Sequence, residues 1–365
     1  MSTQMFEPIK LADVQLKNRV VLAPMCQYSA TPQGSVTDWH FVHWAQFLLA
    51  EAGLLIIEAT GVQPQGRITS ACVGLYDDEN EAALKSVLER VRPFGDAPIL
   101  LQLSHAGRKA AQPVPGADEK QGEIINDKWL VEGPSPIAFG DGWQVPHEMS
   151  EAEIDALVVA FGESAQRAVR AGVQGIEIHA AHGYLLSSFL SPLANRRTDA
   201  YGGSSENRRR LPLRVFDAVR EACPLGMPVG MRINGTDWSE GGITLEDAID
   251  LARALADRGC DFLDVSTGGN AHARIPVGPG YQLSFADAVR RASGLPTIAV
   301  GMIRSPLHAE AIISSGQADM VALGRGFLNN PRWVWHAAES LGVDLEVAQP
   351  YAFGATSAYR PTRGR

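Results

Sequence analysis

The stretch Gly175-Ile-Glu-Ile-His179-Ala-Ala-His182-Gly-Tyr184 begins as a short, largely apolar run and ends in a turn with two histidines and a tyrosine. The run is too short for a helix, and its composition predicts a parallel strand that is covered on both faces. Histidine and tyrosine supply the proton-transfer groups and hydrogen-bond donors that active sites use near neutral pH. An HxxH pair alone is more often structural, or half of a metal site, so its meaning depends on the rest of the chain.

Runs of the same kind recur along the chain, and each is followed by a segment with helical periodicity. They begin near residues 19, 54, 98, 175, 228, 262, 296 and 320. Eight alternating β/α units predict an α/β fold of the (β/α)8 TIM-barrel type. The competing fold, a doubly wound sheet, usually shows a GxGxxG turn after its first strand. Here the first strand ends in Pro24-Met25-Cys26, which favours the barrel.

Residues 108–148 interrupt this rhythm, because they are rich in Pro, Gly, Asp and Lys and have little periodicity. We expect an inserted loop region after the third strand, in the form of a lid or hairpin. Regular structure resumes at Ser150, which with Glu153 forms a capping-box pattern, and the helix that follows is expected to end at Gly172. We therefore expect one barrel domain over residues 1–350 and a C-terminal tail over 351–365.

The composition narrows the class of protein. The chain has 365 residues, 45% hydrophobic and 20% charged, which is ordinary for a globular protein. A net charge of −9 argues against a general binder of nucleic acid or of anionic membranes. No apolar run reaches the length of a membrane span, and no signal segment opens the chain. The four cysteines are scattered without a CxxC pair, which argues against a disulfide framework or a zinc ribbon. We expect a soluble cytoplasmic enzyme that acts on a small molecule.

In a TIM barrel the active site is built from the loops at the carboxyl ends of the strands. Polar residues are concentrated at these ends here, which packing does not explain. In strand order the residues at the ends are Pro24, Met25, Cys26 and Tyr28; Glu58 and Thr60; Gln102 and His105; His179, His182 and Tyr184; Arg232; Ser266; Gly301; and Gly324, Arg325 and Gly326.

The ends of the last two strands suggest a cofactor site. Barrels often bind phosphate there through backbone N–H groups, and Gly301 and Gly324-Arg325-Gly326 fit that role. Ordinary turn glycines would explain the same residues equally well. Gln102 and Arg232, if they point inward, could hold a polar ring such as the pyrimidine edge of a flavin.

A metal site is the alternative for the two histidines. His179 and His182 could bind zinc or iron together with Glu58 or Glu177, as in a flavin-free, metal-dependent barrel hydrolase. No HExxH is present, so the third ligand would have to come from another strand. The phosphate-like glycines and Tyr184 favour an organic cofactor and no metal.

Taken together, the motifs resemble the old yellow enzymes, which are FMN-dependent ene-reductases. The resemblance is closest to their bacterial thermophilic-like branch, which includes xenobiotic reductases, and it covers residues 5–350. The motifs that carry it are Lys17-Asn-Arg-Val, Ala23-Pro-Met-Cys26-Gln-Tyr28, Gln63-Pro-Gln-Gly-Arg67, Gln102-Leu-Ser-His-Ala-Gly-Arg108, His179-Ala-Ala-His182-Gly-Tyr184 and the segment from Asn195 to Arg208. The larger relatives of this fold carry an iron–sulfur cysteine cluster and a second flavin domain, which four isolated cysteines do not match.

The resemblance implies that FMN lies across the barrel mouth. Arg232 would stabilise the reduced ring electrostatically, and Cys26 would contact the ring and tune its potential. Thr60 stands where relatives often carry alanine, so we expect slightly different tuning. The full set implied to hold FMN is Ala23, Pro24, Met25, Cys26, Thr60, Gln102, Arg232, Gly301, Gly324 and Arg325.

The resemblance also implies a two-step reaction. NADPH or NADH first reduces FMN and leaves. An α,β-unsaturated carbonyl compound then binds with its oxygen on His179 and His182, assisted by Tyr28, and receives a hydride at its β-carbon. Tyr184 would protonate the α-carbon. Enones, enals and maleimides are the expected substrates, with quinones and nitro compounds as extensions.

The same branch implies a homo-oligomer, a dimer or a tetramer. In that branch a C-terminal arginine can reach the active site of a neighbouring subunit. Arg360, which follows Tyr359, is the candidate here, and a disordered tail is an equal alternative.

Overall fold

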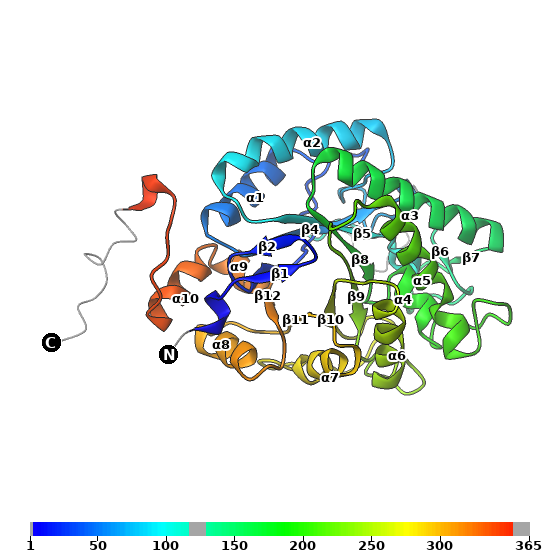
Figure 1. The fold of residues 1–365 in the computed structure, drawn as a ribbon. Coiled ribbons are helices and arrows are strands. Elements are labelled where there is room, and N and C mark those ends of the chain that lie inside the picture. Colours follow the sequence, from blue (N-terminus) through cyan, green and yellow to red (C-terminus); the bar gives the residue numbers. More distant parts are fainter. Residues whose placement is uncertain (1–2, 117–128, 353–365) are drawn as a thin grey trace.

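Eight parallel strands close into one barrel in the computed structural model, which describes residues 3–116 and 129–352 (Figure 1). Each strand pairs with the next one in the series, and the last closes against the first. The (β/α)8 prediction is thus confirmed, including all eight strand positions. The strands are β3 (Val20–Leu22), β4 (Leu54–Gly61), β5 (Ile99–Ser104), β8 (Gly175–Ala180), β9 (Val229–Asn234), β10 (Phe262–Ser266), β11 (Thr297–Val300) and β12 (Met320–Leu323).

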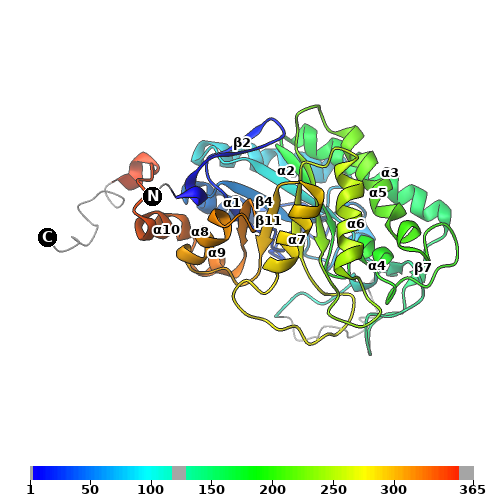
Figure 2. The same cartoon turned by 60° about the horizontal axis from the view of Figure 1, so that its bottom comes forward.

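Helices surround the barrel and bury their apolar faces against it (Figures 1 and 2). Within the described residues, none is long and apolar enough for a membrane crossing. The helices are α1 (Asp38–Leu49), α2 (Asp78–Val91), α3 (Glu151–Ala171), α4 (Leu185–Leu190), α5 (Ser205–Ala222), α6 (Leu245–Ala256), α7 (Leu283–Ser293), α8 (Pro306–Ser314), α9 (Arg325–Asn329) and α10 (Trp333–Leu341).

Local capping explains where two of these helices begin. The Ser150 N–H donates to Glu153 Oε2 at 2.7 Å, and Gly172 ends α3 at φ +97°, as predicted. Helix α1 begins at Asp38, after Thr37 as its N-cap. There His40 Nδ1 accepts the Thr37 N–H at 2.9 Å, a contact that was not predicted because histidine is not a usual capping-box residue.

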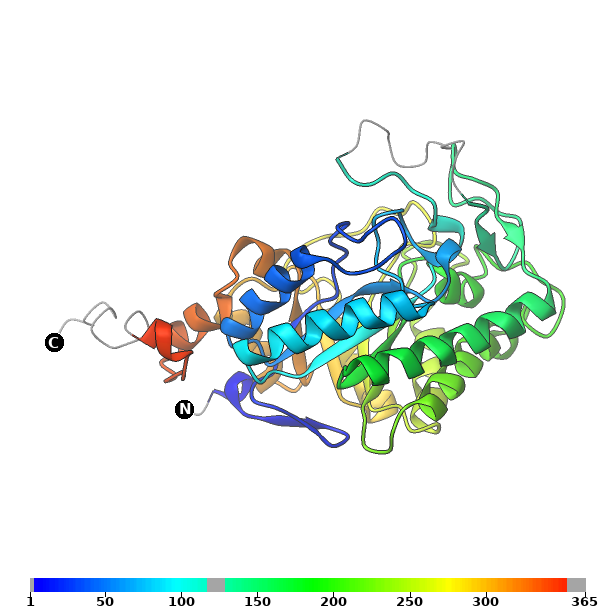
Figure 3. The ribbon, with the colours of Figure 1, turned by 90° about the horizontal axis from the view of Figure 1, so that it is seen from above.

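A short hairpin closes the amino-terminal end of the barrel. It consists of β1 (Ile9–Leu11) and β2 (Val14–Leu16), and it buries Leu11 and Leu16 in the same apolar cluster as the barrel residue Phe262. Figure 3 shows the hairpin on the opposite side of the barrel from the insertion. Because this end is filled by side chains, a ligand site must open at the carboxyl ends of the strands.

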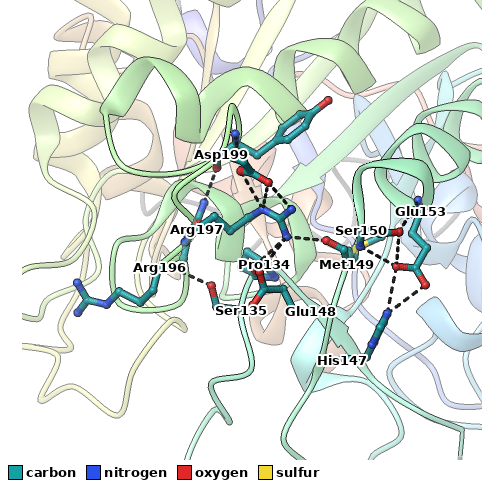
Figure 4. Close-up of polar contacts among 12 residues, drawn as sticks. Pro134, Ser135, His147, Glu148, Met149, Ser150, Glu153, Arg196, Arg197 and Asp199 are labelled. Carbon is teal, nitrogen blue, oxygen red and sulfur yellow. Dashed lines mark hydrogen bonds and ion pairs between the residues drawn. The ribbon is translucent and has the colours of Figure 1, made fainter.

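The insertion after β5 is anchored at its stem by Arg197, which lies in the loop after α4 (Figure 4). Arg197 is 8% exposed, and its Nη1 donates to the carbonyl oxygens of Met149 at 2.6 Å and Pro134 at 3.2 Å. Its Nε donates to Asp199 at 3.0 Å. These bonds join both ends of the segment that holds the two-residue strands β6 (Glu132–Gly133) and β7 (His147–Glu148). The predicted hairpin or lid is therefore a loop fixed at its base.

Replacing Arg197 with methionine is expected to lower the free energy of unfolding by about 2–3 kcal/mol, because two buried carbonyl groups lose their donor. Urea denaturation followed by circular dichroism measures the loss. Arg196→Met is the matched control, since the neighbouring Arg196 side chain is exposed. Equal unfolding free energies for the two variants would contradict the anchoring role.

The tail prediction concerns Tyr359 and Arg360, which lie outside the described residues.

Candidate active site

A cavity of about 220 Å³ opens at the carboxyl ends of β8 to β12. His182, Arg232, Ser266, Gly301, Gly324 and Arg325 all line it. These residues come from distant parts of the sequence, and each had been predicted to lie at a strand end. The other residues predicted to hold a cofactor, from Ala23 to Cys26, Thr60 and Gln102, lie on the ends of β3, β4 and β5.

Two glycines, Gly301 and Gly324, form part of the wall of this cavity. Gly301 has φ +135°, and a Cβ built on it would lie 3.2 Å from the Tyr281 ring. A Cβ on Gly324 would lie 3.3 Å from Met25 Sδ. Side chains at either position would narrow the cavity and keep a ligand away from the backbone N–H groups. Both glycines line the cavity, as a phosphate site would require, and the positive φ of Gly301 also suits an ordinary turn.

A layer of charged and amide side chains lies buried inside the barrel below the cavity. Arg232 Nε lies 3.0 Å from Asp264 Oδ2, and Gln102 Nε2 donates to Glu177 Oε1 at 2.6 Å. Burial, with the nearby Asp264 charge, raises the pKa of Glu177 to about 8. Burial also raises the pKa of Asp264, and the Arg232 charge opposes that rise. The positive charge of Arg232 therefore stabilises the ionised form of two buried carboxyl groups, those of Asp264 and Glu177.

Asp264 was not predicted as a site residue, and Glu177 was predicted only as a possible metal ligand. A signal was present, because Glu177 and His179 alternate on β8, Arg232 and Asn234 on β9, and Asp264 and Ser266 on β10. Alternate residues of a barrel strand face the interior. Polar residues at these registers therefore meet across neighbouring strands.

The two histidines form a directed hydrogen-bond chain. His179 Nδ1 accepts the Ala181 N–H at 3.2 Å, so the ring proton of His179 is on Nε2. This atom lies 3.3 Å from His182 Nδ1, and His182 Nε2 lies 2.7 Å from Ser266 Oγ. Burial, and then the Arg232 charge, holds the pKa of both rings well below the ordinary histidine value. Both are neutral near pH 7, and each offers one N–H.

Tyr184 lies against the histidines, with its ring centroid 4.9 Å from that of His179. Burial, followed by the influence of Cys26, raises the pKa of Tyr184 well above its ordinary value. The same causes raise the pKa of Tyr28. Both phenols therefore keep their protons across the physiological pH range, and both can donate a hydrogen bond.

Lys109 supports this loop and was not predicted. Its Nζ donates to the carbonyl oxygens of His182 at 2.7 Å and Gly269 at 3.2 Å, and it lies 5.3 Å from the centre of the Tyr184 ring. Burial lowers the pKa of Lys109 to about 8. The turns that it joins also touch directly, because a Cβ on Gly183 would lie 1.9 Å from the Gly269 carbonyl oxygen.

The polar side chains at the end of β4 are bonded to other groups of the protein. Thr60 is fully buried, and its hydroxyl donates to the Glu58 carbonyl oxygen at 2.8 Å. Glu58 in turn accepts the Gln27 N–H at 3.0 Å and pairs with His40 at 3.3 Å. The Glu58 carboxylate is therefore bound to the loop after β3 and to α1, and not to the histidine pair. Across the described residues, no group of three or more His, Cys, Asp or Glu is arranged to hold a metal ion.

A profile of the NADH:flavin oxidoreductase / NADH oxidase family matches residues 4–343. The chain belongs to this family. It is 44% identical over 355 residues to an NADPH dehydrogenase of Geobacillus thermodenitrificans, covering 97% of this chain and 99% of that one. It is 39% identical to an NADPH dehydrogenase of Bacillus subtilis, with 97% and 100% covered. The predicted membership in the old yellow enzymes is confirmed.

Solved structures agree with this assignment. Morphinone reductase superimposes with a TM-score of 0.77 at 32% identity, over 96% of this chain and 92% of that one. A 2-naphthoyl-CoA reductase complex gives a TM-score of 0.82 at 25% identity over 94% of this chain, which spans only 53% of that longer protein. The protein is an FMN-dependent oxidoreductase that uses NAD(P)H as reductant, as predicted.

The described residues fit FMN. Gly301, Gly324 and Arg325 line the cavity, and glycines there would let a phosphate approach the backbone N–H groups. Arg232, which is 6% exposed, lies between this cavity and the buried carboxyl groups and presents a positive charge at the mouth. A cavity with glycines in its wall and a buried cation at its mouth would suit an anionic, planar cofactor.

Proposed function

We propose that this protein is an ene-reductase, which reduces the activated C=C bond of α,β-unsaturated carbonyl compounds. The observation that carries the proposal is the cluster of His179, His182 and Tyr184 beside the cavity. Two neutral N–H donors and a protonated phenol lie within ring contact of one another. Such a set can polarise a carbonyl oxygen and supply one proton.

FMN, when bound, would supply the hydride that NADPH or NADH delivers to it. We assign its binding to Ala23, Pro24, Met25, Cys26, Thr60, Gln102, Arg232, Gly301, Gly324 and Arg325. The Arg232 charge would favour the electron-rich form of the ring, because its guanidinium is fixed in place by Asp264.

The substrate oxygen would accept hydrogen bonds from His179 and His182, in exchange for their present contacts with each other and with Ser266. Tyr28 would add a further donor. Tyr184 would hold its proton on Oη until charge develops on the α-carbon, and its buried surroundings prevent earlier loss of that proton. Each step uses a group whose protonation state the surrounding structure fixes.

The names of the structural neighbours describe reductases of morphinone and of 2-naphthoyl-CoA, which is in keeping with carbonyl substrates. We also propose a homo-oligomer, with Arg360 of the tail as the residue that would reach a neighbouring site.

The test is an anaerobic titration in two stages. NADPH should bleach the flavin absorbance of the purified protein, and an enone should then restore it with formation of the saturated ketone. Quinones, which are reduced to hydroquinones, and nitroalkanes, which have no C=C bond, serve as the comparison. Reoxidation by quinones alone, with no saturated product from any enone, would exclude the ene-reductase function. Activity that requires added metal and no flavin would support the hydrolase alternative.

A further inference from the structure

A chain of hydrogen bonds leads from the histidine pair to Gln282, a side chain outside the proposed mechanism. Ser266, the last residue of β10, has its Oγ 2.7 Å from His182 Nε2, and the same hydroxyl donates to Gln282 Oε1 at 3.3 Å. Gln282 directly precedes α7, is 3% exposed and lines the cavity. Its Nε2 donates to the Val300 carbonyl oxygen at 3.0 Å, which leaves its Oε1 facing Ser266.

Backbone groups fix the direction of this chain at both ends. The Ala181 N–H can only donate, so the proton of His179 lies on Nε2, directed at His182 Nδ1. Because burial keeps both rings neutral, His182 has one ring proton, and this proton lies on Nε2, toward Ser266. At the other end the Val300 carbonyl oxygen can only accept. All the donors therefore point from β8 toward β11.

This arrangement places one proton too few where a carbonyl oxygen would bind. His179 Nε2 and His182 Nδ1 lie 3.3 Å apart, so a single oxygen can lie about 2.8 Å from both. His182 Nε2 is already covered by Ser266 at 2.7 Å. An oxygen in contact with both rings would therefore meet the proton of His179 and the lone pair of His182 Nδ1, which repels it.

We propose that a carbonyl ligand makes His182 transfer its proton from Nε2 to Nδ1, and that the Ser266 hydroxyl permits this by turning from Gln282 to His182. Nε2 loses one proton and Nδ1 gains one by exchange with water, so the net charge is unchanged. The bare Nε2 then accepts the Ser266 O–H. Ser266 is thus a positioning residue that acts on the substrate through His182.

Thr267 keeps the cost of this rearrangement low. Its Oγ1 donates to the same Gln282 Oε1 at 2.6 Å. When the Ser266 hydroxyl turns away, the amide oxygen retains this donor, and no buried polar group is left without a partner. The inference rests on the proposed function, because it concerns how the site binds a carbonyl oxygen.

The experiment observes the ring nitrogens of His182 by ¹⁵N NMR in the oxidised flavoprotein, labelled with ¹⁵N-histidine. Without NADPH, cyclohexenone can bind to this protein but cannot be reduced. A His182→Gln variant lacks the His182 signals and so identifies them among the nine histidines. The ligand-free protein should show a protonated Nε2 and a bare Nδ1, and the cyclohexenone complex should show the reverse.

Ser266→Ala should bind cyclohexenone about 5–100-fold more weakly than the wild type at equal flavin content, because the new tautomer leaves a buried acceptor without a donor. The change in flavin absorbance on titration measures this affinity. Thr267→Val should also weaken binding, since the turn of Ser266 then leaves Gln282 Oε1 without a donor.

Ser104→Ala is the matched control and should bind cyclohexenone like the wild type. Ser104 is a buried serine that ends β5, and its hydroxyl has no hydrogen-bond partner within residues 3–116 and 129–352.

A wild type that reduces cyclohexenone with NADPH, while His182 keeps its proton on Nε2 in the complex, would overturn the inference and leave the proposed function intact. Equal affinities of Ser266→Ala and Ser104→Ala for cyclohexenone would do the same. A protein that neither binds nor reduces any enone would overturn both.

Discussion

Replacing Tyr184 with phenylalanine is expected to slow reoxidation of the reduced protein by an enone by a factor of about 10²–10⁴, the usual contribution of one general acid. The phenol is buried, keeps its proton and lies in ring contact with His179. Phenylalanine preserves the ring packing and removes only the acid. Anaerobic stopped-flow mixing of reduced protein with cyclohexenone measures the rate.

Reduction by NADPH should be unchanged in Tyr184→Phe, since that step needs no proton at this position. Tyr76→Phe is the matched control, because the Tyr76 hydroxyl donates to the Gln33 carbonyl oxygen and lies in the loop after β4. If Tyr184→Phe reduced enones at the full rate, Tyr184 would not be the proton donor.

Replacing Arg232 with methionine should lower the free energy of unfolding by about 3–5 kcal/mol, the usual cost of removing one partner of a buried ion pair. Asp264 and Glu177 would remain in the barrel interior without a cation. The variant should also retain less FMN, because the charge at the mouth of the site is lost. Urea denaturation of the apoprotein measures the loss of stability alone. The ratio of flavin to protein absorbance in the purified protein measures the loss of FMN.

The double variant Arg232→Met, Asp264→Asn should recover part of the lost stability without recovering FMN. Arg325→Met, at an exposed position on the cavity edge, should weaken FMN binding and leave unfolding unchanged. An Arg232→Met apoprotein as stable as the wild type would contradict the role of this guanidinium in the buried layer.

The barrel could be predicted because its strands and helices are marked by short sequence patterns within each element. Each buried strand is a short apolar run, and the Ser150 and Gly172 signals mark where α3 begins and ends. The hairpin over residues 9–16 was not predicted, because strands of three residues are too short to show a period. Leu16 packs in the same apolar cluster as residues as distant in sequence as Phe262, and local sequence does not show this.

Candidate site residues were predictable one at a time, but their partners were not. Local sequence shows Arg232 at a strand end, and it does not show that Asp264 holds it. That pairing depends on the register between β9 and β10. Lys109 was missed for a related reason, since its role comes from carbonyl groups of His182 and Gly269, far along the chain.

The backbone contact between Gly183 and Gly269 limits how this protein can evolve or be engineered. Any larger residue at either position would force the loops after β8 and β10 apart, and with them His182. Directed-evolution libraries that include these two positions should yield mostly inactive clones. Residues 271–280, which follow Gly269 and are exposed or half-exposed, are free of that constraint. Substitutions that change the substrate range should therefore accumulate in residues 271–280, while Gly183 and Gly269 stay unchanged.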